Sequence, residues 1–307
     1  MPQSTIKIRG HKSKHNKTSK NDPKLKTNCS PAKDHTTTDI SCYSKTSLEQ
    51  FKLLWNTRHA DDIITTNEPN KIWNSLRQRL SRVCDTERCW MRQNFVLGKL
   101  DYDIIKYTFA PEAPKSWLNN PSEWLSNIDI TDVMKHFEHY FNNFAFIGPS
   151  PIDFDTKVVG DKCVWDELCN FSLTKMIKKQ KKKIGIIFNT DPHTKDGEHW
   201  VSMFIDISAQ PEPYIFYFDS AGDPIKKEIK MFANRIIKQA KEIGIDMNLI
   251  QNYPKIHQKG ETECGIYSLY LIIELLTGRK DYKFFLKNSI SDKSMKKFRN
   301  IYFNHHD

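Results

Sequence analysis

Apolar residues recur at helical spacing in the first third of the chain, once a polar start is passed. Residues 47–55 (SLEQFKLLW) begin with a serine that can cap a helix, and residues 70–84 continue the same pattern. The positions that would share a buried helix side are Leu48, Phe51, Leu54, Trp55, Ile72, Leu76, Leu80 and Val83. The spacing predicts a small helical region over residues 46–115 that ends near the proline-bearing FAPEAPKSWLNNP and contains no obvious chemistry.

The rest of the chain mixes apolar runs typical of strands with longer amphipathic segments. Runs rich in β-branched and aromatic residues predict strands over residues 183–190, 199–208 and 214–220, and a short one near 247–256. Helical spacing predicts helices within residues 121–141, 223–244, 264–278 and 292–303. The pattern therefore predicts an α+β fold, in which a sheet is packed by helices from both ends of the chain.

Charge adds two basic segments to this picture. The net charge is +10 and the sequence pI is about 9.1, which suits an anionic partner. Residues 1–45 have little to bury and predict a disordered basic tail, which serves nuclear targeting or nucleic-acid contact unless it is only solvated. The lysine run at residues 175–185 has two interpretations, a solvated helix end or a segment that makes nonspecific contact with DNA phosphates.

The seven cysteines are an odd number, and no signal peptide or run of 18 apolar residues accompanies them. These features predict a soluble monomer without a membrane partner, in a reducing compartment where free thiols outnumber disulfides. Cys84 and Cys89 lack zinc-ligand spacing and a nearby pair of His or Cys partners. No metal and no cofactor are therefore expected.

Cys264 stands where a charged loop meets an almost wholly apolar helix, in HQKGETECGIYSLYLIIELLTG. The partial positive charge of a helix N-terminus stabilises a thiolate, which suits a nucleophile. Glu261 and Glu263 act in the opposite direction, so a base is needed.

Three other residues supply the remaining chemistry of a thiol nucleophile. His199 opens a predicted strand, where it projects from a rigid element, although a solvated loop histidine is the alternative. Asp219 ends the next strand and could orient an imidazole, although aspartate there is also a turn former. Gln258, six residues before Cys264, could donate to an oxyanion. Each signal is weak alone, whereas their order along the chain is specific.

That order resembles the ubiquitin-like-protein-specific protease and adenoviral endopeptidase superfamily of cysteine proteases, over roughly residues 116–300. The elements NTD…HW, HQ…TECG and a KFR near the C-terminus are most similar to the African swine fever virus type of polyprotein protease from large DNA viruses. The resemblance implies a papain-like, adenain-like catalytic domain over residues 116–307, preceded by an arm-like helical region.

The resemblance also implies roles for individual residues. Cys264 would be the nucleophile, His199 the general base, Asp219 the orienting acid and Gln258 the oxyanion donor. Trp124 and Trp200 would flank a tunnel for a Gly-Gly strand, because glycine backbone passes between closely spaced indoles. Core packing is the alternative for both tryptophans. Asp219 departs from the asparagine or glutamate of relatives, and the loop between His199 and Asp219 is longer than usual.

We expect from this resemblance a cysteine endopeptidase of a large DNA virus that cleaves structural or core precursor polyproteins at Gly-Gly-type sites during virion maturation. It would act in the virion and in viral factories of the host cytoplasm. One alternative is a deconjugating isopeptidase whose substrates carry ubiquitin-like proteins. Another is a non-enzymatic, DNA-binding virion protein with a protease-like fold.

Overall fold

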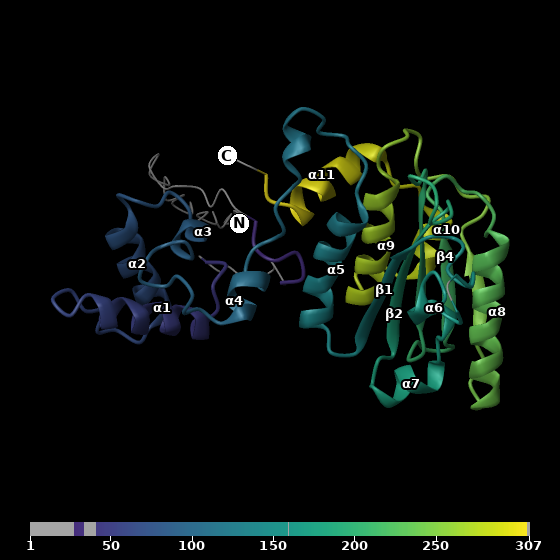
Figure 1. Cartoon of the computed structure of the whole chain (residues 1–307), viewed down its shortest axis with the longest axis horizontal. Coiled ribbons are helices and arrows are strands. Elements are labelled where there is room, and N and C mark those ends of the chain that lie inside the picture. The colour runs from purple at the N-terminus through teal and green to yellow at the C-terminus, as the bar shows by residue number, and fades with distance from the viewer. Residues whose placement is uncertain (1–27, 34–40, 159, 306–307) are drawn as a thin grey trace, which may run out of the picture.

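The computed structural model describes residues 28–33, 41–158 and 160–305, and it separates a helical region from a sheet-containing region (Figure 1). The helical region contains α1 (Lys45–Arg58), α2 (Pro69–Leu80), α3 (Glu87–Trp90) and α4 (Tyr102–Tyr107). Its apolar core includes Phe51, Ile72 and Leu76, all fully buried. This core ends at Phe109, and Ala113 already packs with the sheet-containing region.

The second region is built on one mixed sheet of five strands in the order β1-β2-β3-β4-β5. The strands are β1 (Phe144–Ser150), β2 (Lys183–Asn189), β3 (Trp200–Asp206), β4 (Tyr214–Phe218) and β5 (Asn248–Gln251). Both outer pairs, β1–β2 and β4–β5, are parallel, whereas the central strand β3 is antiparallel to both of its neighbours, β2 and β4. The end of β2, the start of β3 and the end of β4 therefore meet at one edge of the sheet.

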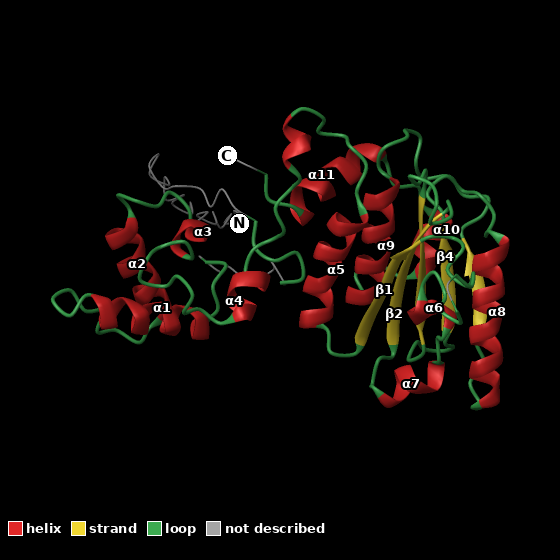
Figure 2. Cartoon of the chain, in the orientation of Figure 1, coloured by secondary structure: helices red, strands yellow, loops and turns green. Residues whose placement is uncertain are grey.

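Helices cover both faces of this sheet, as Figure 2 shows. On one face lie α5 (Asn127–Tyr140) and α9 (Cys264–Thr277), with α10 (Tyr282–Lys287) and α11 (Asp292–Tyr302) around them. The other face packs on α8 (Lys227–Glu242) and on the short helices α6 (Asp166–Cys169) and α7 (Leu173–Lys178). Because successive strand residues enter opposite cores, the central strands are apolar at almost every position.

Helix α9 approaches the sheet closely and so fixes the position of its first residue. A side chain at Gly185 of β2 would place Cβ 2.7 Å from Ile272 of α9, which only glycine avoids. Ser268 of α9 also donates a hydrogen bond of 3.3 Å to the main-chain oxygen of Trp200 in β3. The helix that begins with Cys264 is thereby anchored to the strand that begins beside His199.

The α+β fold class and the helices packed on a mixed sheet are confirmed. The elements that were not anticipated include β1, α6 and α10. The β1 segment FAFIGPS is interrupted by Gly148 and Pro149 and lacks the β-branched run of the central strands. Helix α10 has only six residues, too few for helical spacing to be recognised in the sequence.

The expectation of a disordered tail over residues 1–45 is wrong at its end. Cys42 and Tyr43 are buried in the core of the helical region, Cys29 forms a main-chain bridge with Phe109, and Ser30 is buried beside His136 of α5. Residues 1–27 and 34–40 lie outside the described residues.

The expectation of mostly free thiols is also wrong. Disulfides join Cys29 to Cys42, Cys84 to Cys89 and Cys163 to Cys169, and only Cys264 is free. Folding brings the paired Cα atoms to 5.1, 5.4 and 6.2 Å, distances that sequence spacing does not reveal. None of the described helices is both long enough and apolar enough to cross a membrane.

Candidate active site

His199 and Asp219 lie at the same edge of the sheet, on neighbouring antiparallel strands. His199 directly precedes β3, and Asp219 directly follows β4. The imidazole Nε2 lies 2.8 Å from Asp219 Oδ1, within hydrogen-bond distance. The aspartate side chain is fully buried, whereas the histidine keeps a 23% exposed side chain. The pair therefore presents an imidazole held by a buried carboxylate.

Asn252, at the end of β5, fixes the main chain on both sides of this carboxylate. Its Oδ1 accepts a hydrogen bond of 2.9 Å from the Asp219 N–H, and its Nδ2 donates one of 2.7 Å to the main-chain oxygen of Asp219. Asp219 Oδ1 also accepts from the Ala221 N–H at 2.8 Å. Sequence analysis missed Asn252, since a single asparagine after a short strand carries no signal of its own.

Cys264 is the first residue of α9 and is 1% exposed. Its thiol interacts with the His199 ring and contributes to raising the pKa of His199. Because Nε2 is occupied by Asp219, the ring atom left to face sulfur is Nδ1. Glu263 precedes the helix without a side-chain cap bond, so no capping side chain competes for the first N–H groups of α9. These N–H groups suit a developing oxyanion.

The surroundings of His199 favour its protonated form. Burial alone lowers the pKa of the ring, but hydrogen bonds to Asp219 and Cys264 and the negative charges of both partners outweigh burial and raise the pKa of His199 to about 10. An imidazolium at His199 is the state that this arrangement stabilises at neutral pH.

Gln258 is tied to the turn after Asp219 rather than to Cys264. Its Oε1 accepts a hydrogen bond of 2.7 Å from Ser220 Oγ, and its Nε2 donates one of 2.7 Å to the Gly260 oxygen. An amide nitrogen carries two N–H groups, so the bond to Gly260 uses one of them. The assignment of Gln258 as oxyanion donor remains a prediction.

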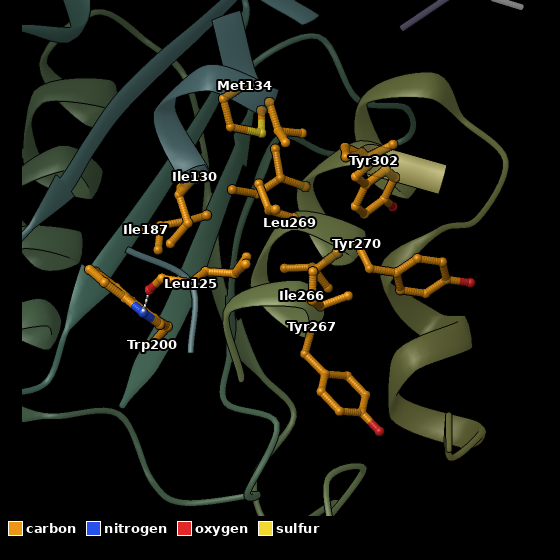
Figure 3. Close-up of a cluster of buried hydrophobic side chains, with 14 of the residues drawn as sticks. Leu125, Ile130, Met134, Ile187, Trp200, Ile266, Tyr267, Leu269, Tyr270 and Tyr302 are labelled. Carbon is orange, nitrogen blue, oxygen red and sulfur yellow. Dashed lines mark hydrogen bonds between the residues drawn. The ribbon is translucent and has the colours of Figure 1, made fainter. Parts of the chain in front are cut away.

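Trp124 and Trp200 line the same cleft, which has a volume of about 880 Å³. Trp200 is 9% exposed and donates an indole hydrogen bond of 2.9 Å to the Leu125 oxygen (Figure 3), whereas Trp124 is 40% exposed. Cys264, His199 and Asp219 lie outside the lining, beside its Trp200 end. The structure thus brings both tryptophans to a cleft that begins one residue from His199.

Gly265 allows the nucleophile helix to contact this cleft wall. A Cβ at Gly265 would lie 3.0 Å from Leu125 Cβ and 3.1 Å from Leu125 Cγ. The glycine after Cys264 therefore lets α9 approach the Trp124–Leu125 segment closely.

Within residues 28–33, 41–158 and 160–305, no group of three His, Cys, Asp or Glu side chains could hold a metal ion.

A family model matches this part of the chain. Residues 130–307 match the C-terminal catalytic domain of the Ulp1 protease family. The matched segment begins within α5 and contains His199, Asp219, Gln258 and Cys264.

Viral proteins are similar over most of the chain. A protein named as a thiol protease of Acanthamoeba polyphaga mimivirus is 33% identical over 253 residues, covering 80% of this chain and 78% of the relative. A protein named as a cysteine protease of African swine fever virus (isolate Tick/Malawi/Lil 20-1/1983) is 25% identical over 251 residues, covering 78% of this chain and 90% of the relative.

One solved structure extends the likeness of fold to the helical region. A crystal structure of the African swine fever virus protease aligns with a TM-score of 0.64 at 22% identity, and the alignment covers 92% of this chain and 97% of that one.

Proposed function

We propose that this chain cleaves structural or core precursor polyproteins of a large DNA virus. The chain belongs to the Ulp1 protease family and is a cysteine protease. Cleavage would occur at Gly-Gly-type sites during virion maturation. The proposed places of action are the virion and the viral factories of the host cytoplasm, which accords with the viral origin of its relatives.

In the proposed mechanism, the Cys264 thiolate attacks the scissile carbonyl carbon while His199 is protonated. The carbonyl oxygen becomes an oxyanion, which the Cys264 N–H and one Gln258 N–H stabilise. Imidazolium donates its proton to the leaving amine as the C–N bond breaks. Water, deprotonated by the now neutral His199, then attacks the thioester carbonyl; the C–S bond breaks, and the Cys264 thiolate returns beside the imidazolium. Asp219 holds the ring throughout through the 2.8 Å bond to Nε2.

The observation that carries the substrate proposal is the pair of tryptophans on the cleft beside His199. Indole faces on both sides of a strand leave no room for side chains, so glycine suits the positions between them. The covalent step itself requires only the acyl group of a peptide bond. A precursor with exposed Gly-Gly linkers meets both requirements.

A deconjugating activity is the second candidate, because several African swine fever virus relatives carry the name SUMO-1 cysteine protease. The chemistry would be identical, with the bond to a lysine side chain in place of a main-chain bond. The helical region favours the polyprotein candidate, because the likeness to the viral protease structure covers it too. Membership of a protease family speaks against a purely DNA-binding protein.

Nonspecific DNA remains a proposed second partner. Lys175, Lys178, Lys179 and Lys182 are exposed on and after α7. This patch lies at the start of β2, whereas His199 lies beyond its end, a strand length of about 20 Å away. DNA held there would leave the cleft open, and its affinity would fall with salt.

The test uses three kinds of substrate with the purified full chain: Gly-Gly-Xaa peptides, matched Gly-Ala-Xaa peptides, and proteins conjugated to SUMO-like modifiers. The proposal predicts cleavage of the first set, weak cleavage of the second, and none with Cys264→Ala. Cleavage of conjugates alone would favour the deconjugating candidate. N-terminal mapping of proteins in particles made with wild-type and Cys264→Ala enzyme then identifies the natural precursor.

A further inference from the structure

Glu263, the residue before the nucleophile, forms a buried ion pair with Arg299 of α11. Arg299 Nη2 lies 3.3 Å and Nε 3.4 Å from Glu263 Oε2. The residues are 1% and 3% exposed, so water screens neither charge. The carboxylate adjacent to Cys264 is therefore matched by a guanidinium supplied from 36 residues further along the chain.

The same guanidinium also holds the segment that carries Trp124. Arg299 Nη1 donates a hydrogen bond of 2.8 Å to the Glu123 oxygen, and Nη2 reaches the Thr262 oxygen at 3.5 Å. Its Cζ lies over the Trp117 ring, 4.4 Å from the ring centroid. One side chain thus contacts both the residues before the nucleophile and the residue before the cleft-lining tryptophan.

The pairing has an electrostatic consequence for the thiol. An unmatched carboxylate next to Cys264 would oppose formation of a thiolate, whereas an unmatched guanidinium would favour it. Since both groups are excluded from water, solvent would screen the charge–charge interaction with the thiol only weakly in either case. When the two charges are matched, the electric field at the thiol comes mainly from His199 and from the N-terminus of α9.

We infer that Arg299 is a positioning residue with two separable actions on the protease reaction. It cancels the charge of Glu263 beside the nucleophile, and it fixes the Glu123–Trp124 segment that forms one wall of the substrate cleft. The inference deepens the proposed function and rests on it for the second action. The first action concerns only the reactivity of the thiol.

Other ionisable groups face this pair and are part of its environment. Asp129 at the start of α5 interacts with Arg299, and burial raises the pKa of Asp129. Tyr267 of α9 interacts with Glu263, and its hydroxyl bonds to Asp292 of α11 at 2.9 Å. These groups are unchanged in the variants below, so they contribute equally to every comparison.

Charge-removing substitutions on the two sides of the pair test the first action. Arg299→Gln leaves Glu263 unmatched and is expected to move the pH dependence of Cys264 alkylation by iodoacetamide upward by about one pH unit. Glu263→Gln leaves Arg299 unmatched and should move it downward. The double variant should return it near the wild-type position. A purely structural role would not produce shifts of opposite sign, and unshifted profiles in both single variants would overturn the first action.

The second action is tested separately from the first by measuring the Michaelis constant for a Gly-Gly-Xaa peptide. Arg299→Lys keeps the charge but loses the planar contacts to Glu123 and Trp117, so KM should rise several-fold with an unshifted alkylation profile. Glu263→Gln keeps the contact to Glu123, so its KM should stay near wild type. Equal KM in all variants would overturn the second action.

Each variant is compared at equal folded fraction, established by circular dichroism. Because the double variant buries no unmatched charge, it remains informative if a single variant unfolds. Alkylation needs no substrate, so a protein that alkylates as expected yet cleaves no Gly-Gly peptide contradicts the proposed function and leaves the first action standing.

Discussion

Ser220 Oγ donates a hydrogen bond of 2.7 Å to Gln258 Oε1, so the turn that follows Asp219 also orients the glutamine. The main-chain oxygen of Ser220 accepts from the N–H groups of His257 and Gln258 at 2.9 and 2.8 Å. Because the hydroxyl occupies the oxygen end of the amide, the nitrogen end points elsewhere. The orienting acid and the predicted oxyanion donor therefore belong to one hydrogen-bonded unit.

Replacing Ser220 with alanine is expected to lower kcat/KM about tenfold, because the amide of Gln258 loses the bond that selects its orientation. Gln258→Ala should lower kcat by about 10²–10³-fold if its N–H stabilises the oxyanion. The measurement is steady-state cleavage of a Gly-Gly-Xaa peptide. Ser289→Ala removes an exposed serine that bonds to the Ile256 oxygen and serves as the control. Unchanged kinetics in Gln258→Ala would remove this residue from the oxyanion site.

The pKa of His199 is expected to fall when either partner is removed. Cys264→Ala removes the thiol, and Asp219→Asn removes the negative charge but keeps an acceptor oxygen; both partners contribute to raising this pKa to about 10. NMR titration of the imidazole Cε1–H measures the change. In the wild-type enzyme, activity should decline only as the pH rises through about 10, where imidazolium loses the proton that the leaving amine requires.

The same pKa has a consequence for folding with a definite sign. The folded value of about 10 lies above the ordinary 6.5, so this group contributes its full stability below pH 6.5 and loses it as the pH rises through 10. Cys264→Ala should therefore flatten the loss of thermal stability between pH 7 and 10. An equally steep loss in this variant would contradict the assigned ion pair.

The central strands could be predicted from the sequence because both faces of β2, β3 and β4 are buried. This burial requires continuous apolar runs, which are visible without a structure. The edge strand β1 was missed because its Gly148–Pro149 step removes the usual strand signal. The three disulfides were missed because pairing depends on Cα distances that only the folded chain fixes.

The candidate site divides in the same way. His199, Asp219 and Cys264 could be selected because each stands at the end of a recognisable element, and the structure brings them together. Asn252 could not be selected, and Arg299 stood out only as part of the KFR motif without a role, since each acts on a residue more than 30 positions away. The Glu263 carboxylate, which by itself opposes formation of a thiolate at Cys264, is paired with Arg299, a contact that no local pattern encodes.

Acid is expected to destabilise the fold through two buried histidines. Burial lowers the pKa of His136 and of His257 to about 4. His257 accepts the Ile290 N–H at Nδ1, 3.3 Å away, and its Nε2 faces the Phe285 oxygen, so only the neutral ring satisfies both contacts.

Between pH 6.5 and 4 the unfolded chain binds protons that the folded chain excludes, so stability is full above pH 6.5 and falls as the pH drops towards 4. Thermal unfolding at half-unit pH steps measures the decline. A melting temperature that is constant between about pH 6.5 and 4.5 would contradict the burial of neutral rings.

Thiol titration without reductant is expected to detect one reactive group per chain. Six cysteines are paired in disulfides, and Cys264 is the free one. Cys264→Ala should then give no reaction in the native protein, and reduction under denaturing conditions should reveal six thiols in this variant. A second thiol in the unreduced native protein would show that one of the pairs is open.

Gly265→Ala is expected to weaken substrate binding through the cleft wall. The new Cβ would lie 3.0 Å from Leu125 Cβ, a contact tighter than side chains normally adopt, so the wall must move by a few tenths of an ångström. The main-chain oxygen of Leu125 accepts a hydrogen bond from the Trp200 indole N–H, so a displacement of Leu125 also shifts Trp200 on the other side of the cleft. We expect KM to rise about tenfold or less, since a misplacement of about 1 Å has effects near 10²-fold.

Gly185→Ala is the comparison for this prediction, because it introduces an even tighter contact on α9, at Ile272 rather than at the residue next to Cys264. Its Cβ would lie 2.7 Å from Ile272 Cγ2, between β2 and α9, and overpacking of this kind destabilises a core by about 1–3 kcal/mol. It should lower the melting temperature and leave KM unchanged, whereas Gly265→Ala should raise KM, and Gly265→Ser should raise it further. Equal effects of Gly265→Ala and Gly185→Ala on KM would mean that general loosening, rather than the position of Leu125, governs binding.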